Sequence, residues 1–387
     1  MPLVRTLGAV AIAIVLGLTS LAAAARANPL LLVDMDTLDV LYAQDAGQPW
    51  HPASLTKLMT AYVTFEQIAA GNVSLDTPVI LSAKAVAQAP SKSGLPVDSA
   101  LTMQDALYVM LVKSANDVAM AIAETVGGDE AGFVAMMNDA ASRMGLTATH
   151  YVDPNGLKHE NQYTSARDLA VLSLYIRQNF PQYLPIFGTE MVQLGKARLE
   201  SENELLTKLD GTTGMKTGYI CASGLNMVAT VERNGRKLMA IVLGASSKRE
   251  RNERAAELVL DGFSGTARSQ GISILNVANN PGVAPVNMRP MICGKEARAY
   301  VSAQEAAFPM GLEGHPSYLL DTIEARTYTA TNLGRIRTGI ELPRPRPMHV
   351  PTMPAAPATA DLGTEYQPAL ATMGGGNIPF PRPRPNF

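Results

Sequence analysis

The pair Asn234-Gly235 limits the possible folds of this chain more than any other local feature of its sequence. The pair lies between two apolar runs, at residues 225–232 and 237–244. Asparagine and glycine both tolerate the positive φ that a two-residue hairpin turn demands. The sequence therefore predicts two long antiparallel strands joined at this turn.

Helical segments are predicted between further strands. Two N-terminal apolar runs, residues 30–33 and 39–43, predict strands on either side of a turn. Thr102 is predicted to cap one helix, Ser114 interrupts the pattern that follows, and Gly145 ends a later helix. An earlier helix shows the three-and-four spacing of one buried face, at Leu55, Leu58, Met59, Tyr62 and Val63. We expect an α+β fold in which an antiparallel sheet is packed with helices.

The first 27 residues have the layout of a secretory signal peptide. Arg5 supplies an early positive charge, residues 7–25 are almost all apolar, and Ala25-Arg26-Ala27 places small residues at the spacing of a cleavage site. The alternative is an uncleaved membrane anchor, because the apolar run is nearly long enough to span a bilayer. Both interpretations predict that the body of the chain is exported, with the periplasm as its expected compartment.

The composition of the chain changes twice towards its C-terminus. After about residue 265 the periodic patterns weaken, and we expect a small extension at residues 266–340. Residues 341–387 contain the sequence Pro-Arg-Pro-Arg-Pro twice, at 343–347 and 381–385. Such a segment cannot bury enough apolar surface to fold, so it predicts a disordered tail. The tail is either a solvated spacer or a basic arm that contacts wall polymer, a membrane surface or an aromatic groove.

The overall composition excludes several classes of protein. With 47% apolar residues among 387, the chain can form a large core. Its 34 acidic and 32 basic residues give a formal net charge of −2, which does not favour nucleic acid as a partner. The two cysteines and five scattered histidines lack the spacing of metal ligands, so we expect no metal. The cysteines can form one disulfide at most.

The first of three short chemical motifs is Ser54-Leu55-Thr56-Lys57. Residues three apart share a helix face, so the amine of Lys57 can approach the hydroxyl of Ser54. A lysine that burial and a second cation have deprotonated can act as a base towards a serine nucleophile. Taken alone, the motif is better explained as a helix cap.

The other two motifs are Ser114-Ala115-Asn116 and Lys216-Thr217-Gly218. The first lies at a break between helices, where a hydroxyl and a carboxamide can relay a proton and orient an amide. The second lies in an extended run, where a strand edge and a positive charge can bind an extended peptide. Their alternatives are a simple turn and a solvated edge strand.

The order and spacing of the three motifs resemble those of penicillin-binding proteins and serine β-lactamases. Residues 28 to about 265 closely resemble the low-molecular-mass D-alanyl-D-alanine carboxypeptidases, peptidase family S11. The stretch from Tyr163 to Leu169 and the sequence Ser223-Gly224-Leu225 support this resemblance. It implies a β-lactamase/transpeptidase-like fold in which a helical subdomain accompanies the sheet.

The resemblance also implies a role for each matching residue. Ser54 is the expected nucleophile and Lys57 its base, while Ser114 and Asn116 relay a proton and orient the substrate. The N–H groups of Ser54 and Tyr219 are expected to form an oxyanion hole. Lys216, Thr217 and Gly218 are expected to bind the substrate, together with Arg251, which matches the family's carboxylate-binding arginine; the nearby Arg249 and Arg254 are alternatives to it.

The sequence departs from the family pattern at Ile220, where many relatives have a threonine. The loss of that hydroxyl leaves Thr217 and an arginine to recognise the substrate carboxylate. Cys221 follows directly, and a bridge to Cys293 would join the segment after the catalytic strand to the region beyond the domain. Two free thiols are the alternative.

The activity implied by the resemblance is that of a serine-type D-Ala-D-Ala carboxypeptidase with no metal or organic cofactor. Its expected partners are peptidoglycan stem peptides that end in D-Ala-D-Ala, with β-lactams as inhibitors. A D,D-endopeptidase, a serine β-lactamase and a non-catalytic peptidoglycan-binding protein are the alternatives. Residues 117–215 lack the Glu-x-x-Leu-Asn segment on which efficient β-lactamases depend, which disfavours the second alternative.

Overall fold

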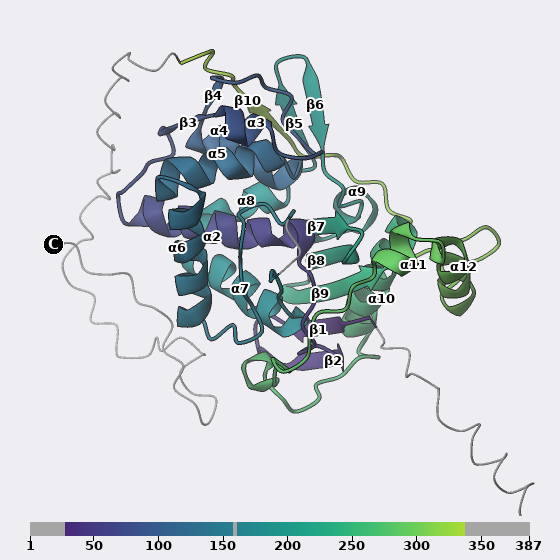
Figure 1. Ribbon diagram of the computed structural model, residues 1–387. Coiled ribbons are helices and arrows are strands. Elements are labelled where there is room, and N and C mark those ends of the chain that lie inside the picture. Colours follow the sequence, from purple (N-terminus) through teal and green to yellow (C-terminus); the bar gives the residue numbers. More distant parts are fainter. Residues whose placement is uncertain (1–27, 158–160, 337–387) are drawn as a thin grey trace, which may run out of the picture.

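The computed structural model describes residues 28–157 and 161–336 (Figure 1). The predicted signal peptide at residues 1–27 and the predicted tail at residues 341–387 lie outside the described residues. Within the described part of the chain, no helix is both long and apolar enough to cross a membrane.

A five-stranded antiparallel sheet forms the centre of the fold, with the strand order β2-β1-β9-β8-β7. Asn234 and Gly235 have φ values of 52° and 75°, so the predicted hairpin turn is confirmed. The two predicted N-terminal strands are also confirmed. The bounds of the five strands are β1 Leu30–Asp34, β2 Val40–Gln44, β7 Thr212–Ile220, β8 Gly224–Arg233 and β9 Arg236–Ala245.

Helices cover both faces of this sheet, because its central strands are apolar on both sides. In β9, Met239 and Ile241 belong to one core cluster, whereas Ala240 and Val242 belong to the other. The first cluster includes α2 (Lys57–Ala69) and α7 (Ala166–Asn179), and the second includes α9 (Leu205–Lys208) and α10 (Lys248–Ser264). The predicted α+β class is therefore confirmed.

A helical subdomain lies beside the sheet, around α2 (Figure 1). The Thr102 hydroxyl accepts a hydrogen bond from the N–H of Asp105, which confirms the predicted cap. Ser114 lies in the break between two helices, and Gly145 follows the last residues of a third with a φ of 66°. The helices concerned are α4 Met103–Val112, α5 Asn116–Gly127 and α6 Glu130–Arg143, with the short α3 Ala83–Val86.

Several short elements connect these layers. A two-stranded sheet pairs β3 with β4, and a three-stranded sheet has the order β10-β5-β6. The strand bounds are β3 Pro78–Ile80, β4 Ala100–Thr102, β5 Met191–Leu194, β6 Ala197–Glu200 and β10 Thr327–Ala330. The remaining helices are η1 Ala53–Thr56, η2 Pro181–Tyr183, α8 Leu184–Phe187, η3 Ile274–Asn276, α11 Arg289–Cys293 and α12 Ala297–Ala307.

The segment after α10 packs onto the rest of the protein. Gly265 ends α10 in the left-handed region, at the position where the sequence composition changes. Beyond it, Ile274, Met288 and Ala330 are buried in the same core cluster as the helical subdomain. Strand β10 pairs in parallel with β5, more than 130 residues earlier in the chain. The described part of the predicted extension therefore shares the core of the preceding residues.

Candidate active site

The turn that carries Ser54 is fixed against the central sheet. The buried Asn226 of β8 donates from Nδ2 to the carbonyl oxygens of His51 and Pro52, at 2.9 and 3.3 Å. Its Oδ1 accepts a hydrogen bond from the N–H of Gly244 at 2.9 Å. These three contacts join the 51–52 segment to two strands. Sequence analysis missed Asn226, because nothing in its local pattern distinguishes it from other strand residues.

Gly218 allows β7 to lie directly against the Ser54 turn. A Cβ at residue 218 would lie 3.0 Å from both the backbone nitrogen of Ser54 and the carbonyl oxygen of Pro52. Side chains rarely tolerate contacts this short with backbone atoms. The third residue of the Lys216-Thr217-Gly218 motif therefore meets a steric need of the site.

Lys57 forms the centre of the site. Its Nζ lies 3.0 Å from Ser54 Oγ, 2.7 Å from Asn116 Oδ1 and 2.7 Å from the carbonyl oxygen of Asn155. Both amide oxygens can only accept hydrogen bonds, so they take the two hydrogens of a neutral amine. The lone pair of that amine is then directed at the Ser54 hydroxyl, which is the arrangement a general base requires.

The electrostatics of the site favour the neutral form of Lys57. Burial, followed by the positive charge of Lys216, lowers the pKa of the Lys57 amine well below its ordinary value. The negative charges of Asp153 and Asp117 oppose this shift. Burial, followed by the charge of Arg251, lowers the pKa of Lys216 to about 7. The positive charge of Lys216 thus makes it harder for Lys57 to hold a proton.

Asn116 reaches this site from the start of α5, and Ser114 lies two residues earlier, in the break between α4 and α5. Asn116 is held at its backbone N–H, which donates to Ser91 O at 2.8 Å, and at its Nδ2, which donates to Pro90 O at 2.7 Å. Ser114 has a φ of 61°, and its buried Oγ has no hydrogen-bond partner among the described residues. A buried hydroxyl without a hydrogen-bond partner destabilises the folded protein unless a substrate or a water molecule forms a hydrogen bond with it.

The turn at residues 153–156 is a part of the site that sequence analysis missed. Asp153 Oδ1 accepts hydrogen bonds from the N–H groups of Asn155 and Gly156, at 3.2 and 2.6 Å. This turn directs the Asn155 carbonyl at Lys57. The signal in the sequence is Asp153-Pro154-Asn155-Gly156, which is typical of a tight turn but carries no catalytic signature.

Of the three candidate arginines, Arg251 is the one that interacts with Lys216. Arg251 is buried, and its guanidinium donates to the Glu202 carbonyl oxygen at 2.7 Å and to Asn252 Oδ1 at 3.0 Å. Arg249 donates instead to carbonyl oxygens beyond α12, and Arg254 donates to Glu250 on its own helix. The positive charge of Arg251 therefore lies close enough to Lys216 to act on it.

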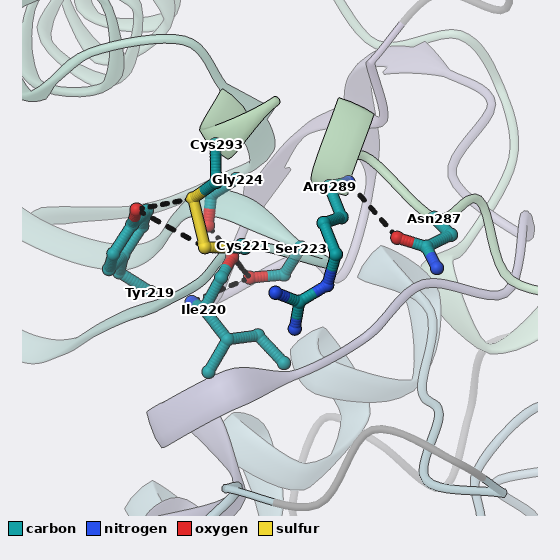
Figure 2. The surroundings of a disulfide bond; sticks show 8 residues. All are labelled: Tyr219, Ile220, Cys221, Ser223, Gly224, Asn287, Arg289 and Cys293. Atoms are coloured by element: carbon teal, nitrogen blue, oxygen red, sulfur yellow. Dashed lines mark hydrogen bonds between the residues drawn. A yellow bond between two sulfur atoms is a disulfide. The ribbon is translucent and has the colours of Figure 1, made fainter. Parts of the chain in front are cut away.

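Strand β7 is the edge of the central sheet, so one side of it is available to an extended peptide. Thr217 is buried, whereas the Tyr219 side chain is 51% exposed. The predicted pairing of Cys221 with Cys293 is present as a disulfide, which joins the end of β7 to α11 (Figure 2). The Tyr219 hydroxyl lies 3.2 Å from Cys293 Sγ, against this bridge.

The stretch from Tyr163 to Leu169 supports the fold and lies apart from this hydrogen-bond network. Ser165 caps α7, and its hydroxyl accepts from the N–H of Asp168. The Asp168 carboxylate accepts from the Ala148 N–H at 2.9 Å and from the Thr149 hydroxyl at 2.8 Å. In the described parts of the chain, no group of three histidine, cysteine or acidic residues could hold a metal ion.

The buried charge of Lys216 predicts a measurable effect on stability. The pKa of Lys216 is about 7 in the folded protein and near 10.5 in the unfolded chain. The burial of the charged amine therefore lowers the free energy of unfolding by its full amount below about pH 7. This cost disappears as the pH rises towards 10.5, because the folded protein then buries the neutral amine, without its proton. We expect Lys216→Met to raise the melting temperature most near pH 7, by about 2–4 °C for each kcal/mol gained.

Thermal unfolding followed by circular dichroism at several pH values would test this effect. The control is Lys196→Met, because Lys196 is exposed and its charge is solvated in both states. We expect no pH-dependent gain from the control. A Lys216→Met variant that is no more stable than the wild type at neutral pH would contradict the prediction.

A family model described as D-alanyl-D-alanine carboxypeptidase, peptidase family S11, matches residues 18–247. This region is more than half of the chain. The chain belongs to this family. The resemblance indicated by the three motifs is therefore confirmed, and all three motifs of the carboxypeptidase family lie inside the matched region.

Individual members of the carboxypeptidase family agree with this assignment. DacD of Salmonella typhimurium is 33% identical over 236 residues, which cover 59% of this chain and 60% of DacD. DacD of Escherichia coli is 32% identical over 60% of this chain and 62% of its own length. The chain thus spans about three fifths of the length of these curated relatives.

Solved structures of penicillin-binding proteins share the fold. Penicillin binding protein 5 from Haemophilus influenzae has a TM-score of 0.59 at 29% identity, over 62% of this chain and 71% of that chain. Penicillin-Binding Protein D2 from Listeria monocytogenes, in its cefotaxime-bound form, has a TM-score of 0.55 at 29% identity, over 62% of this chain and 97% of that chain. Arg251 and Cys293 lie beyond the residues that the carboxypeptidase family model matches.

Proposed function

We propose that this protein is a serine-type D-Ala-D-Ala carboxypeptidase that removes the terminal D-alanine from peptidoglycan stem pentapeptides. One observation carries the proposal. Both hydrogens of a neutral Lys57 amine have acceptors in Asn116 Oδ1 and the Asn155 carbonyl, and its third contact is the Ser54 hydroxyl. A structural lysine would need no such alignment with a serine.

The proposed reaction begins with the transfer of the Ser54 proton to Lys57. Ser54 Oγ then forms a bond with the carbonyl carbon of the penultimate D-alanine, and the carbonyl oxygen becomes an oxyanion. The N–H groups of Ser54 and Tyr219 stabilise that oxyanion. When the C–N bond breaks, the proton passes from Lys57 through Ser114 to the leaving nitrogen of D-alanine.

Hydrolysis of the resulting acyl-enzyme completes the cycle. Water adds to the ester carbonyl, the base accepts its proton, and Ser54 Oγ leaves and regains a proton. In this scheme Lys216, Thr217 and Arg251 bind the terminal carboxylate of the substrate. The proposed peptidase domain comprises residues 28–265, followed by the extension at residues 266–340.

The proposed function has consequences for the cell wall and for inhibition. Removal of the terminal D-alanine would limit cross-linking and so influence cell shape. Penicillin-Binding Protein D2 from Listeria monocytogenes has been solved with cefotaxime and with ampicillin, which supports covalent inhibition of this chain by β-lactams. We place the enzyme in the periplasm, with contact between the tail and wall polymer or the outer face of the inner membrane as part of the proposal.

Mass spectrometry of purified peptidoglycan pentapeptide tests the proposed function. We expect the wild-type protein to remove one alanine residue, and we expect prior incubation with benzylpenicillin to block that loss. Cleavage of cross-linked dimers instead of pentapeptides would favour a D,D-endopeptidase. A pentapeptide that the enzyme leaves intact would contradict the proposal.

A further inference from the structure

The segment 287–293 is attached at two points to the residues that follow β7. The N–H of Met288 donates to the carbonyl oxygen of Ala222 at 2.9 Å, and the Met288 side chain is buried. Five residues later, Cys293 is bonded to Cys221. Arg289 lies between these two attachments, so its backbone is fixed beside the turn that follows β7.

The Arg289 side chain is exposed. Among the described residues, it forms no ion pair. Its backbone N–H donates to Asn287 Oδ1 at 3.0 Å. Figure 2 shows the side chain extending from the start of α11 towards the turn that contains Ile220 and Ser223. The guanidinium is therefore available to a ligand at this end of β7.

One face of β7 presents three residues in a fixed order. Lys216, Gly218 and Ile220 alternate with Thr217 and Tyr219, so they share the face that contacts the Ser54 turn. Ile220 lies about 7 Å further along the strand than Gly218. The face therefore runs from a buried cation, past the nucleophile, to an apolar residue with Arg289 beyond it.

This order sets the direction of a bound peptide. Gly218 lies against Ser54, so the scissile carbonyl belongs at that level of the strand. Lys216, with Arg251 near it, attracts the terminal carboxylate on one side of Ser54. The residues upstream of the scissile bond must then lie along the other half of β7, towards Ile220 and Arg289.

We propose that Arg289 is a specificity-determining residue that binds a carboxylate on the peptide upstream of the scissile bond. This inference rests on the proposed carboxypeptidase function and adds a preference for acidic stem peptides to it. Arg289 lies outside the residues 18–247 that the family model matches, so the preference belongs to this chain's own extension. The disulfide holds the residue in place.

Two synthetic peptides test the preference. Both end in D-Ala-D-Ala, and the residue before this pair is glutamate in one peptide and glutamine in the other. We expect the wild type to have a higher kcat/KM for the glutamate peptide. In Arg289→Gln, the KM for that peptide should rise and the preference should fall about two- to fivefold, as expected for one exposed charged contact.

Arg298→Gln is the matched control, because Arg298 is an exposed arginine on α12 and its replacement changes the net charge equally. We expect it to keep the wild-type preference. The double variant Cys221→Ser, Cys293→Ser should weaken the preference less than Arg289→Gln does, because the attachment at Met288 still holds the segment. Covalent penicillin labelling would verify that each variant is folded.

The outcomes separate this inference from the proposed function. If the wild type cleaves neither peptide, the proposed carboxypeptidase function fails. If the wild type cleaves both peptides and Arg289→Gln leaves the ratio of their kcat/KM values unchanged, the assignment of Arg289 is overturned while the carboxypeptidase function stands. An equal fall of this ratio in the Arg298→Gln control would also overturn the assignment of Arg289, because the loss of one net positive charge would then explain the effect.

Discussion

Ser54→Ala is expected to abolish covalent labelling of the protein by penicillin. The hydroxyl of Ser54 is the atom that Lys57 faces at 3.0 Å, and its removal leaves no oxygen to attack the β-lactam carbonyl. The loss should be at least about a thousandfold in acylation rate, as expected when a covalent nucleophile is removed. Fluorescent penicillin, followed by denaturing electrophoresis and intact mass measurement, provides the test.

The control for this variant is Ser142→Ala, an exposed serine on α6 outside the site. It should be labelled at the wild-type rate. Persistent labelling of Ser54→Ala would show that another residue is acylated. Ser114 would then be the residue to examine, because its buried oxygen has no hydrogen-bond partner among the described residues.

The parts of the fold that the sequence could predict are those fixed by local chemistry. Asn234 and Gly235 adopt positive φ because a two-residue turn demands it, so the hairpin could be inferred without any distant contact. The cap at Thr102 depends on a bond to a residue three positions later. The Ser54 and Lys57 pair is similarly local, because its members are three positions apart.

The parts that the sequence could not predict depend on contacts between distant segments. Asn155 reaches Lys57 through a carbonyl oxygen, and every residue type has one, so no pattern of side chains reports it. Asn226 contacts a segment 174 residues earlier, which only the packing of the sheet reveals. Strand β10 contains four residues, too few for its alternation to distinguish a strand from a loop.

Lys57→Arg is expected to reduce penicillin acylation by at least about a thousandfold, although it keeps a cation at the site. A guanidinium stays protonated at all accessible pH values, so it cannot accept the Ser54 proton. Lys57→Met should show the same loss, because it removes the base altogether.

The pH dependence of acylation separates a base from a mere positive charge. Because the pKa of Lys57 is well below its ordinary value, the wild-type rate should fall only as acid protonates this amine. Lys216, with a pKa of about 7, loses its charge above neutrality, which should weaken the binding of carboxylate substrates there. Stopped-flow measurement of the acylation rate of wild type and Lys57→Arg between about pH 5 and 10 tests both the fall in acid and the weaker binding above neutrality. A Lys57→Arg variant that regains wild-type rates at any pH would show that the charge of Lys57, and not its lone pair, activates Ser54.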